Sequence, residues 1–241
     1  MKLLELTLET PQENLALDEA LLQVAETGQH EADEVLRLWE SPRHVVVLGR
    51  SSDAQAEVDL DACQRRGIPV FRRSSGGATV LIGPGCLMYA VVLSYELRPQ
   101  LRMIETAHQF VLERLRQAIE PQVPEIAPQG TSDLTINSRK FSGNSLRCRQ
   151  RHLLYHGTIV YDFSTALMAE CLAAPARQPD YREGRTHQDF VVNIPIDPDI
   201  LRSQLAHAWD ATTPLVHWPS AETAQIVAEK YSQAKWRISS D

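Results

Sequence analysis

The stretch "SDLTINSRKFSGNS", from Ser132 to Ser145, predicts two strands joined by a tight turn. "DLTI" and "RKFS" are strand-like runs, and the Asn137-Ser138 pair between them is typical of a two-residue hairpin turn. Strand alternation then places Lys140 and Phe141 on opposite faces of the second strand. A lysine on a strand usually points into solvent. This lysine lies just before a Ser-Gly-Asn turn, a place where a cation can meet a ligand.

Similar runs on both sides of this hairpin predict a sheet of many strands. They are "LLELTL", "VLRLW", "HVVVLG", "IPVF", "ATVLI", "CLMYAVVLSY" and "LLYHGTIVYDF". The unbroken apolar runs "VVV" and "YAVVL" are typical of strands covered on both faces. Apolar residues at helical spacing predict helices near residues 17–25, 104–119, 201–209 and 224–231. We therefore expect an α+β fold with a mixed, largely antiparallel sheet flanked by helices.

Composition narrows the class of protein. The chain has 241 residues, 43% of them hydrophobic, with a net charge of -7. This charge disfavours nucleic acid as the main partner, because phosphate binding depends on a basic surface. The sequence has no signal-like start and no apolar run long enough to span a membrane. The four cysteines are scattered without a CxxC pair, which suits a reducing compartment. We expect a cytoplasmic protein that binds neither nucleic acid nor a membrane.

The stretch "FRRSSGGATVLIGPG", from Phe71 to Gly85, is a candidate anion site. It matches neither of the common glycine-rich nucleotide loops. Gly76 and Gly77 permit positive φ and close approach of a ligand, so their N–H groups are able to line an anion site. Arg72 or Arg73 would add a bidentate clamp on a carboxylate or phosphate. The alternative is a strand–turn–strand unit with surface arginines, and the residues alone leave both interpretations open.

The stretch "LRCRQRHLLYHGTIVYDF" combines a basic run with an apolar strand. If extended, Arg147, Arg149 and Arg151 form a basic strip on one side. The alternative is a solvated hairpin arm. His156, at the start of the "HGT" segment, is interpreted from its surroundings as a hydrogen-bonded structural histidine.

Five blocks in this order resemble the lipoate–protein ligase A family, within the biotin/lipoate ligase and octanoyltransferase superfamily. The blocks are "NLALDEAL" from Asn14, "VVVLGR" ending at Arg50, "RRSSGGATV" from Arg72, "SDLTINSRKFSGNS" from Ser132 and "HGTIVYD" from His156. The resemblance implies a fold related to class II aminoacyl-tRNA synthetases and biotin ligases. It also implies one catalytic domain over residues 1–241, without the small C-terminal accessory domain of the long ligases.

The activity that this resemblance implies has two steps. Lipoate (or octanoate) and ATP with Mg²⁺ would give an acyl-adenylate and pyrophosphate, and a lysine of a lipoyl carrier domain would then attack the acyl group. The carrier would be a 2-oxoacid dehydrogenase E2 domain, a glycine cleavage H-like protein or a related lipoate-binding protein. A separate accessory subunit is a further expected partner.

The resemblance also implies the site residues. Lys140 matches the active-site lysine, Asp133 is a candidate Mg²⁺ ligand, and the segment from Asn144 to His152 would be a loop that closes over the adenylate. The residues expected to bind lipoate or ATP are Arg50, Arg72, Arg73, Ser74, Ser75, Gly76, Gly77, Ala78, Asp133, Ser142, Gly143, Asn144, His156, Gly157 and Thr158. Arg147, Arg149 and Arg151 would dock an acidic carrier.

The sequence departs from the ligase pattern at three positions. Ala78 and Ile82 replace a glycine and a histidine of the glycine-rich block, and Ser132 replaces an asparagine. The stretch from Pro175 to Asn193 is closer to the cysteine-dependent transferase branch. An octanoyl or lipoyl transferase acting through Cys171, without ATP, is therefore the alternative, although helical spacing favours a buried Cys171. A non-catalytic subunit that needs a partner is a third hypothesis.

Overall fold

The computed structural model describes residues 1–28, 34–174 and 178–239. Its larger sheet consists of β1 (Lys2–Glu5), β2 (Val35–Glu40), β6 (Cys86–Ser94), β7 (Ile126–Gln129), β8 (Asp133–Ile136), β9 (Arg139–Cys148), β10 (His152–Val160) and β11 (Thr213–Pro214). The strand order is β11-β1-β2-β6-β10-β9-β8-β7. Neighbouring strands pair antiparallel, except that β1 is parallel to both β2 and β11. The expected mixed, largely antiparallel sheet is confirmed.

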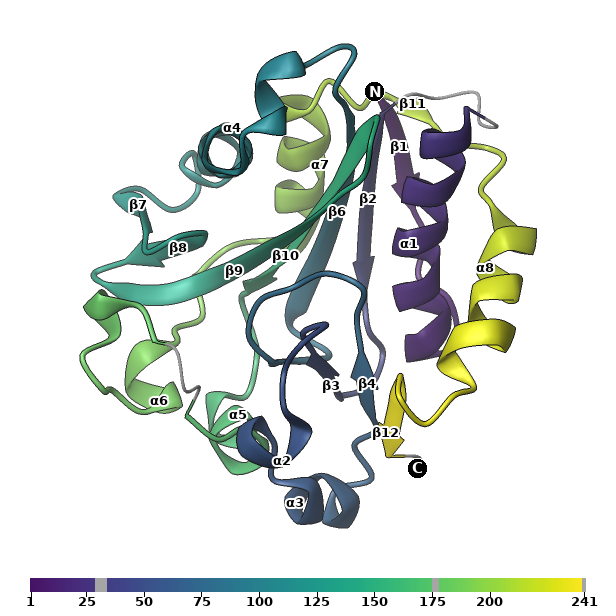
Figure 1. Cartoon of the computed structure of the whole chain (residues 1–241). Helices are drawn as coiled ribbons and strands as arrows, with labels where there is room; N and C mark the ends of the chain where they lie inside the picture. Colours follow the sequence, from purple (N-terminus) through teal and green to yellow (C-terminus); the bar gives the residue numbers. More distant parts are fainter. Residues whose placement is uncertain (29–33, 175–177, 240–241) are drawn as a thin grey trace.

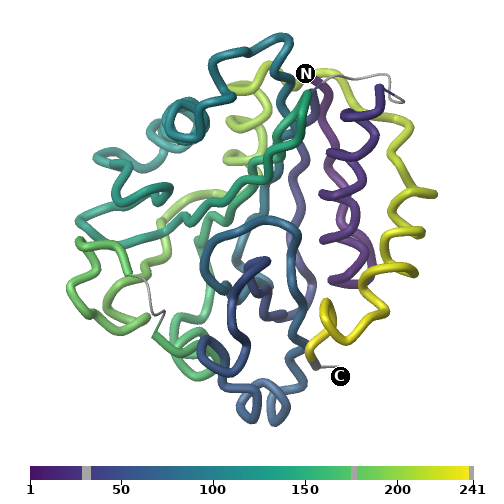
Figure 2. The backbone as a smooth tube through the Cα atoms, in the orientation of Figure 1, coloured from purple at the N-terminus to yellow at the C-terminus, as the bar shows by residue number. Residues whose placement is uncertain are grey.

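Helices cover both faces of this sheet (Figure 1). On one face lies α1 (Pro11–Thr27), which begins with a capping box between Thr10 and Glu13. The C-terminal helix α8 (Ser220–Ile226) and the π-helical turn over Val227–Tyr231 run beside α1, as the tube in Figure 2 shows. On the other face, α4 (Ile104–Ile119) packs against α7 (Pro198–Ala208). These are the four helices that the apolar spacing predicts.

The central strand β6 is buried on both faces, as its unbroken apolar run predicts. Tyr89, Val91 and Leu93 belong to the larger core cluster. Ala90 and Val92 belong to a second cluster, under α1. The division follows from the strand, because successive side chains point to opposite faces.

The predicted hairpin is present between β8 and β9. Asn137 and Ser138 have φ of 50° and 55°, the two positive values that a type I′ turn requires. The pairing shifts by one residue further along, because Leu134 faces Ser142 while the next residue of β8 faces Lys140. Phe141 is therefore an extra, bulged residue, and the simple alternation expected around Lys140 is interrupted.

A smaller sheet carries the glycine-rich segment. Its order is β12 (Arg237–Ser239), β4 (Val70–Arg72), β3 (Val45–Leu48) and β5 (Val80–Ile82). Residues 73–79, the glycine loop, connect β4 to β5. The helical spacing around Cys171 agrees with the short helix α5 (Thr165–Cys171). The other short helices, which the sequence pattern does not predict, are α2 (Ala54–Glu57), α3 (Leu60–Arg65), α6 (His187–Phe190) and the 3₁₀ turns Pro99–Arg102 and Asp180–Arg182. None of the helices in the described ranges has the length and apolar character to cross a bilayer.

One expectation about a loop is wrong. The segment from Asn144 to His152 is the second half of β9, a three-residue turn and the first residue of β10. Asn144 pairs with Gly157, and Cys148 pairs with Leu153. The segment is held as a hairpin because both of its arms belong to the sheet.

Candidate functional site

Arg73 turns inward and holds the glycine loop together. Its side chain is buried, and Nε donates to Ser75 Oγ (3.0 Å) while Nη1 donates to the carbonyl of Val47 (3.1 Å). Nη2 donates to the carbonyls of Gly76 and Ala78. Burial lowers the pKa of Arg73 to about 10. Arg73 therefore supports the loop, because its nitrogens donate to acceptors within the protein, and its side chain also lines a pocket described below, so its contact with a ligand stays a prediction.

Arg72 also supports the backbone instead of facing a ligand. Its Nη1 donates to the carbonyls of Gly49 (2.8 Å) and Ser52 (2.7 Å). The side chain of Arg50 is exposed, and its backbone N–H donates to the carbonyl of Ser75 (2.8 Å). The two segments, 49–52 and the glycine loop, therefore brace each other.

Gly77 gives the loop its shape. Its φ is +84°, and a Cβ at Gly49 would lie 1.9 Å from the carbonyl oxygen of Gly77. Ser145 of β9 donates to the carbonyl of Gly76 (2.9 Å). Within the described residues, the N–H groups of Gly76 and Gly77 have no hydrogen-bond acceptor. The loop thus turns its carbonyls inward and leaves these donors for a ligand, as an anion-binding turn requires.

Lys140 pairs with Asp133 across the hairpin. Its Nζ lies 2.7 Å from Oδ1 of Asp133, and the hydroxyl of Tyr181 donates to Oδ2 (2.7 Å). The lysine side chain is 29% exposed. A Cβ at Gly143 would lie 2.6 Å from Cε and 2.7 Å from Nζ of Lys140, so any side chain there would displace the ammonium group from this position. Asp133 thus holds the ammonium group of Lys140 in place, and the absence of a side chain at Gly143 leaves space for it.

Two pockets meet at Lys140. The first pocket lies between α1, the glycine loop and the β9–β10 hairpin, and its lining includes Leu15, Asp18, Val47, Arg73, Gly77, Met88, Asn144, Ser145, His156 and Gly157. The second pocket lies on the side of α5 and α6, and its lining includes Glu57, Leu81, Asp133, Phe141, Ser142, Val160, Met168, Arg182, His187, Phe190 and Val191. Both are lined by Ala78, Thr79, Val80, Lys140, Gly143 and Thr158.

A larger groove lies elsewhere, between α4 and the residues after β7. Ile104, His108 and Leu112 line one side of it, and Pro128 and Thr131 line the other. This groove contains none of the residues that the sequence motifs select, so size alone does not identify the site.

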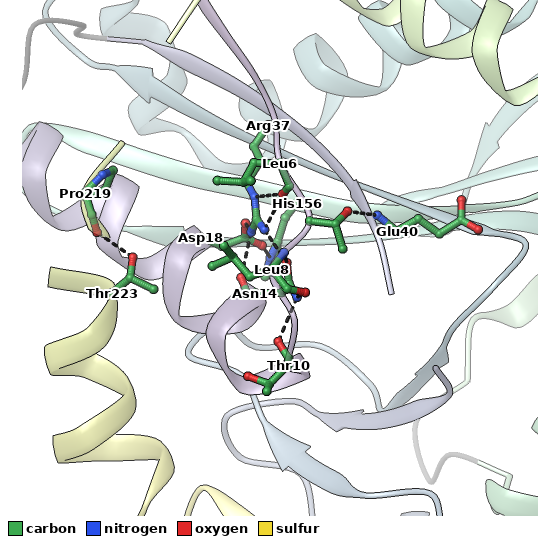
Figure 3. A network of polar contacts seen from close by, with 11 residues as sticks. Leu6, Leu8, Thr10, Asn14, Asp18, Arg37, Glu40, His156, Pro219 and Thr223 are labelled. Atoms are coloured by element: carbon green, nitrogen blue, oxygen red, sulfur yellow. Dashed lines mark hydrogen bonds and ion pairs between the residues drawn. The ribbon is translucent and has the colours of Figure 1, made fainter. Parts of the chain in front are cut away.

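A buried polar chain reaches the first pocket through Asp18 and His156. Figure 3 shows these two residues together with Arg37. Ser75 Oγ lies 2.6 Å from Nε2 of His156, and Nδ1 of His156 lies 3.7 Å from Oδ2 of Asp18. Ser75 Oγ accepts from Arg73 and also hydrogen-bonds to Nε2, and the direction of this second bond depends on the tautomer of His156. Arg37 completes the chain with a hydrogen bond to Asp18 Oδ1 (2.6 Å). His156 is therefore hydrogen-bonded, as the sequence predicts, and it also lines the first pocket.

Arg37 is fully buried and has several acceptors. It donates to the carbonyls of Leu6 and Asn14 and to the side-chain oxygen of Asn14 (2.6 Å). Burial lowers the pKa of Arg37, and the negative charge of Asp18 opposes this effect. The network fixes α1 against the sheet, and it keeps the Asp18 carboxylate at the first pocket.

Other predicted residues stabilise the pocket wall. The side-chain amide of Asn144 donates to the carbonyl of Ser132 (2.7 Å) and accepts from the hydroxyl of Tyr89 (2.5 Å). Ser142 is buried beside it. A Cβ at Gly157 would lie 1.8 Å from the Asn144 oxygen, so a glycine is required on the neighbouring strand. Ser74 is buried in the glycine loop.

The three arginines expected to dock a carrier do not form one strip. Arg147 is largely covered and pairs with Glu19 (3.1 Å), which also pairs with Lys230. Arg149 and Arg151 lie at the exposed turn of the β9–β10 hairpin. Burial lowers the pKa of Arg147, and the nearby cations Arg149 and Arg50 add to this effect. The region around Glu19 therefore carries excess positive charge beside the glycine loop, on a chain of net charge -7.

The thiols lie outside the pocket linings. Cys171 is buried beside Cys63, and burial raises the pKa of both thiols. The buried position predicted for Cys171 is confirmed. Cys148 is exposed at the end of β9. A nucleophilic cysteine needs access and a lowered pKa, and Cys171 has neither.

Two polar residues of the second pocket are absent from the site residues that the sequence predicts. Arg182 and His187 come from the stretch between Pro175 and Asn193, of which residues 175–177 lie outside the described residues. No local motif marks these two positions. Only the packing of this stretch against β9 brings them next to Lys140.

Residues 10–199 match the model of the lipoyl protein ligase A/B catalytic domain, and this range includes the glycine loop, the hairpin and both pockets. The chain belongs to the lipoyl protein ligase A/B catalytic domain family. This membership agrees with the resemblance that the five sequence blocks carry.

Relatives within this family differ in activity. The "Probable lipoate-protein ligase A" of Mycoplasma genitalium is 31% identical over 162 residues, which cover 67% of this chain and 46% of that protein. The "Octanoyltransferase LipM" of Carboxydothermus hydrogenoformans is 34% identical over 167 residues, covering 61% of this chain and 60% of that protein. The "Lipoate-protein ligase A subunit 1" of Thermoplasma acidophilum is 23% identical and covers 97% of this chain and 95% of that protein. The chain spans about half the length of the mycoplasmal ligases that it matches.

Solved structures of the same fold include lipoate ligases. The bipartite lipoate protein ligase of Thermoplasma acidophilum, described together with its E2 lipoyl domain, has a TM-score of 0.81 at 21% identity and covers 98% of this chain and 95% of that chain. A lipoate-protein ligase A bound with ATP has a TM-score of 0.81 at 20% identity and covers 98% of this chain and 97% of that chain. At these identities the likeness shows the fold.

Proposed function

We propose that this protein is an ATP-dependent lipoate–protein ligase. It joins lipoate or octanoate to AMP and then transfers the acyl group to a lysine of a lipoyl carrier domain. The observation that carries this proposal is the position of Lys140, at the boundary shared by two pockets. A reaction between two bound anions, a carboxylate and an α-phosphate, needs a fixed cation at the place where they meet.

The first pocket suits the acyl chain. Leu15, Val47 and Met88 give it apolar walls, and burying a methylene group is worth about 0.8 kcal/mol. This pocket therefore takes the tail of the acid, with the carboxylate directed toward Lys140.

The second pocket suits the nucleotide. Phe141 and Phe190 belong to its apolar wall, while Arg182, His187 and Lys140 supply its basic side chains. The carboxylate of the bound acid attacks the α-phosphorus, and pyrophosphate leaves with the electrons of the broken P–O bond. Lys140 lowers the barrier because it attracts the oxygens of both reactants as their charges approach. No protein nucleophile is needed, since AMP is the leaving group in the second step.

Magnesium would enter with the phosphates of ATP. The expected ligand Asp133 already accepts from Lys140 and Tyr181, and the described residues include no group of three His, Cys, Asp or Glu that could hold a metal. Mg²⁺ commonly binds through substrate phosphates plus one or two carboxylates. The residues present fit a phosphate-bound ion and not a preformed metal site.

The carrier and a second subunit complete the proposal. A lipoyl domain is the acceptor, and the excess of cations around Glu19, including Arg147 and Arg149, suits an acidic carrier. The similarity to a protein named as subunit 1 of a ligase supports a separate accessory subunit. We assign catalysis to this chain, because the two pockets and Lys140 belong to it.

One assay tests the function. The protein is incubated with lipoate, ATP, Mg²⁺ and a carrier domain, with and without an accessory subunit, and the carrier is weighed by mass spectrometry. We expect a mass gain that requires ATP and persists in the Cys171→Ser variant. Omission of ATP and of lipoate provides the two controls.

Two other outcomes would replace this proposal. A mass gain from octanoyl carrier protein without ATP, abolished by Cys171→Ser, would identify the transferase that the similarity to an octanoyltransferase favours. The absence of any mass gain, even with the accessory subunit, would favour a non-catalytic role.

A further inference from the structure

Arg182 is a buried arginine of the second pocket with an unused donor. Its exposed fraction is 3%, and Nε donates to the carbonyl of Arg185 (3.0 Å). The guanidinium carbon lies 4.8 Å from the ring centroid of Phe190. Nη2 is buried without a hydrogen-bond partner among the described residues. Buried donors almost always have acceptors, so this one requires an explanation.

The neighbours of Arg182 form a site for negative charge. His187, the first residue of α6, is half-buried, and burial together with Arg182 and Lys140 lowers its pKa to about 4. The acidic side chains that line the pocket are already engaged. Glu57 accepts from the N–H and hydroxyl groups of Thr79, and Asp133 accepts from Lys140. Arg182 and His187 are thus left with capacity for an outside acceptor.

The geometry points to Arg182 and His187 as the residues that bind the phosphate of a nucleotide, with the base against the apolar wall of the second pocket. This inference rests on the proposed function and assigns two residues that none of the sequence motifs includes. A phosphate offers several acceptor oxygens, and an arginine fork matches them better than a lysine does. The apolar wall, which includes Phe141 and Val191, has no comparable donor for these oxygens.

Calorimetric titration of the full chain with adenosine and with AMP tests the inference. The two ligands differ only in the phosphate, so we expect the wild type to bind AMP more tightly. Arg182→Met should weaken AMP at least tenfold, about 1.4 kcal/mol, and should leave adenosine within twofold. His187→Asn should weaken AMP about threefold and also spare adenosine. Arg66→Met is the matched control, because this exposed arginine pairs with Glu170 outside both pockets.

Each other result overturns the inference. Equal losses of affinity for adenosine and AMP would show that Arg182 only maintains the shape of the pocket. Unchanged AMP affinity would show that these residues do not bind the phosphate. Loss of octanoate binding instead would assign Arg182 to the acyl carboxylate. If Arg182→Met does not fold, as melting would reveal, Arg182→Lys and His187→Asn decide the matter.

Failure of the proposed ligase function can be distinguished from failure of this inference. A wild type that binds neither AMP nor ATP would sink the ATP-dependent reaction and this inference together. If the wild type binds AMP and Arg182→Met binds it with the same affinity, only the inference about Arg182 is contradicted.

Discussion

Replacement of Arg73 by methionine should destabilise the whole chain and not merely weaken ligand binding. Arg73 donates four hydrogen bonds, to Val47, Ser75, Gly76 and Ala78. At about 1.5 kcal/mol for each bond from a charged donor, their loss costs about 6 kcal/mol. Methionine fills similar space but leaves these acceptors without the donor.

The burial of the charge offsets part of this loss. Burial lowers the pKa of Arg73 from 12.5 to about 10, which corresponds to a free-energy cost of about 3 kcal/mol for burying the charge. An uncharged side chain avoids this cost. The free energy of unfolding should therefore fall by about 3 kcal/mol, and the melting temperature by about 10 °C in a chain of this size. The stability of Arg73→Lys should lie between those of the wild type and Arg73→Met, because one ammonium group cannot reach all four acceptors.

Urea unfolding followed by circular dichroism measures this change. Arg50→Met is the control, because the exposed Arg50 side chain makes none of these bonds, and its unfolding should match the wild type. An Arg73→Met variant with unchanged stability and lost ligand affinity would refute the reasoning. Arg73 would then contact the ligand, as the resemblance to the ligase family implies.

Three further changes test the site and its packing. Lys140→Met should lower the rate of carrier modification by 10²–10³-fold, as loss of a fixed transition-state cation typically does; a rate within fivefold of the wild type in single-turnover assays would contradict this role. Gly143→Ala should lower the same rate at least tenfold with little change in the urea midpoint, because the new methyl group would lie 2.7 Å from the Lys140 ammonium. His187→Phe should remove a pH-dependent loss of stability. The pKa of His187 lies near 4 in the folded protein and near 6.5 when unfolded, so the unfolded chain binds more protons between these values. Wild-type stability should then fall by about 1 kcal/mol between pH 7 and pH 5, allowing for solvent screening, and parallel urea curves for both proteins would exclude this effect.

Local patterns account for the elements that the sequence predicts correctly. The alternation in β6, the helical spacing in α4 and the Asn137-Ser138 turn each depend on residues that are close together in the chain. The order of the family blocks predicts the role of Lys140, and the family match over residues 10–199 includes this position.

Contacts between distant segments account for what the sequence pattern missed. Arg73 takes its acceptor from Val47, 26 positions away, so its turn into the protein has no local signal. Arg182 is buried without a partner for Nη2 only because its segment packs beside β9. The hairpin from Asn144 to His152 was expected as a loop, since its polar residues conceal two paired strands.

The sequence by itself determined the strands, the main helices and the family of this protein, because backbone periodicity and motif order are properties of neighbouring residues. The tertiary structure alone decided which cations support the glycine loop and which face a pocket. An arginine is available to a ligand only if folding brings no carbonyl or carboxylate to its nitrogens, and those acceptors come from segments that meet only in the folded chain.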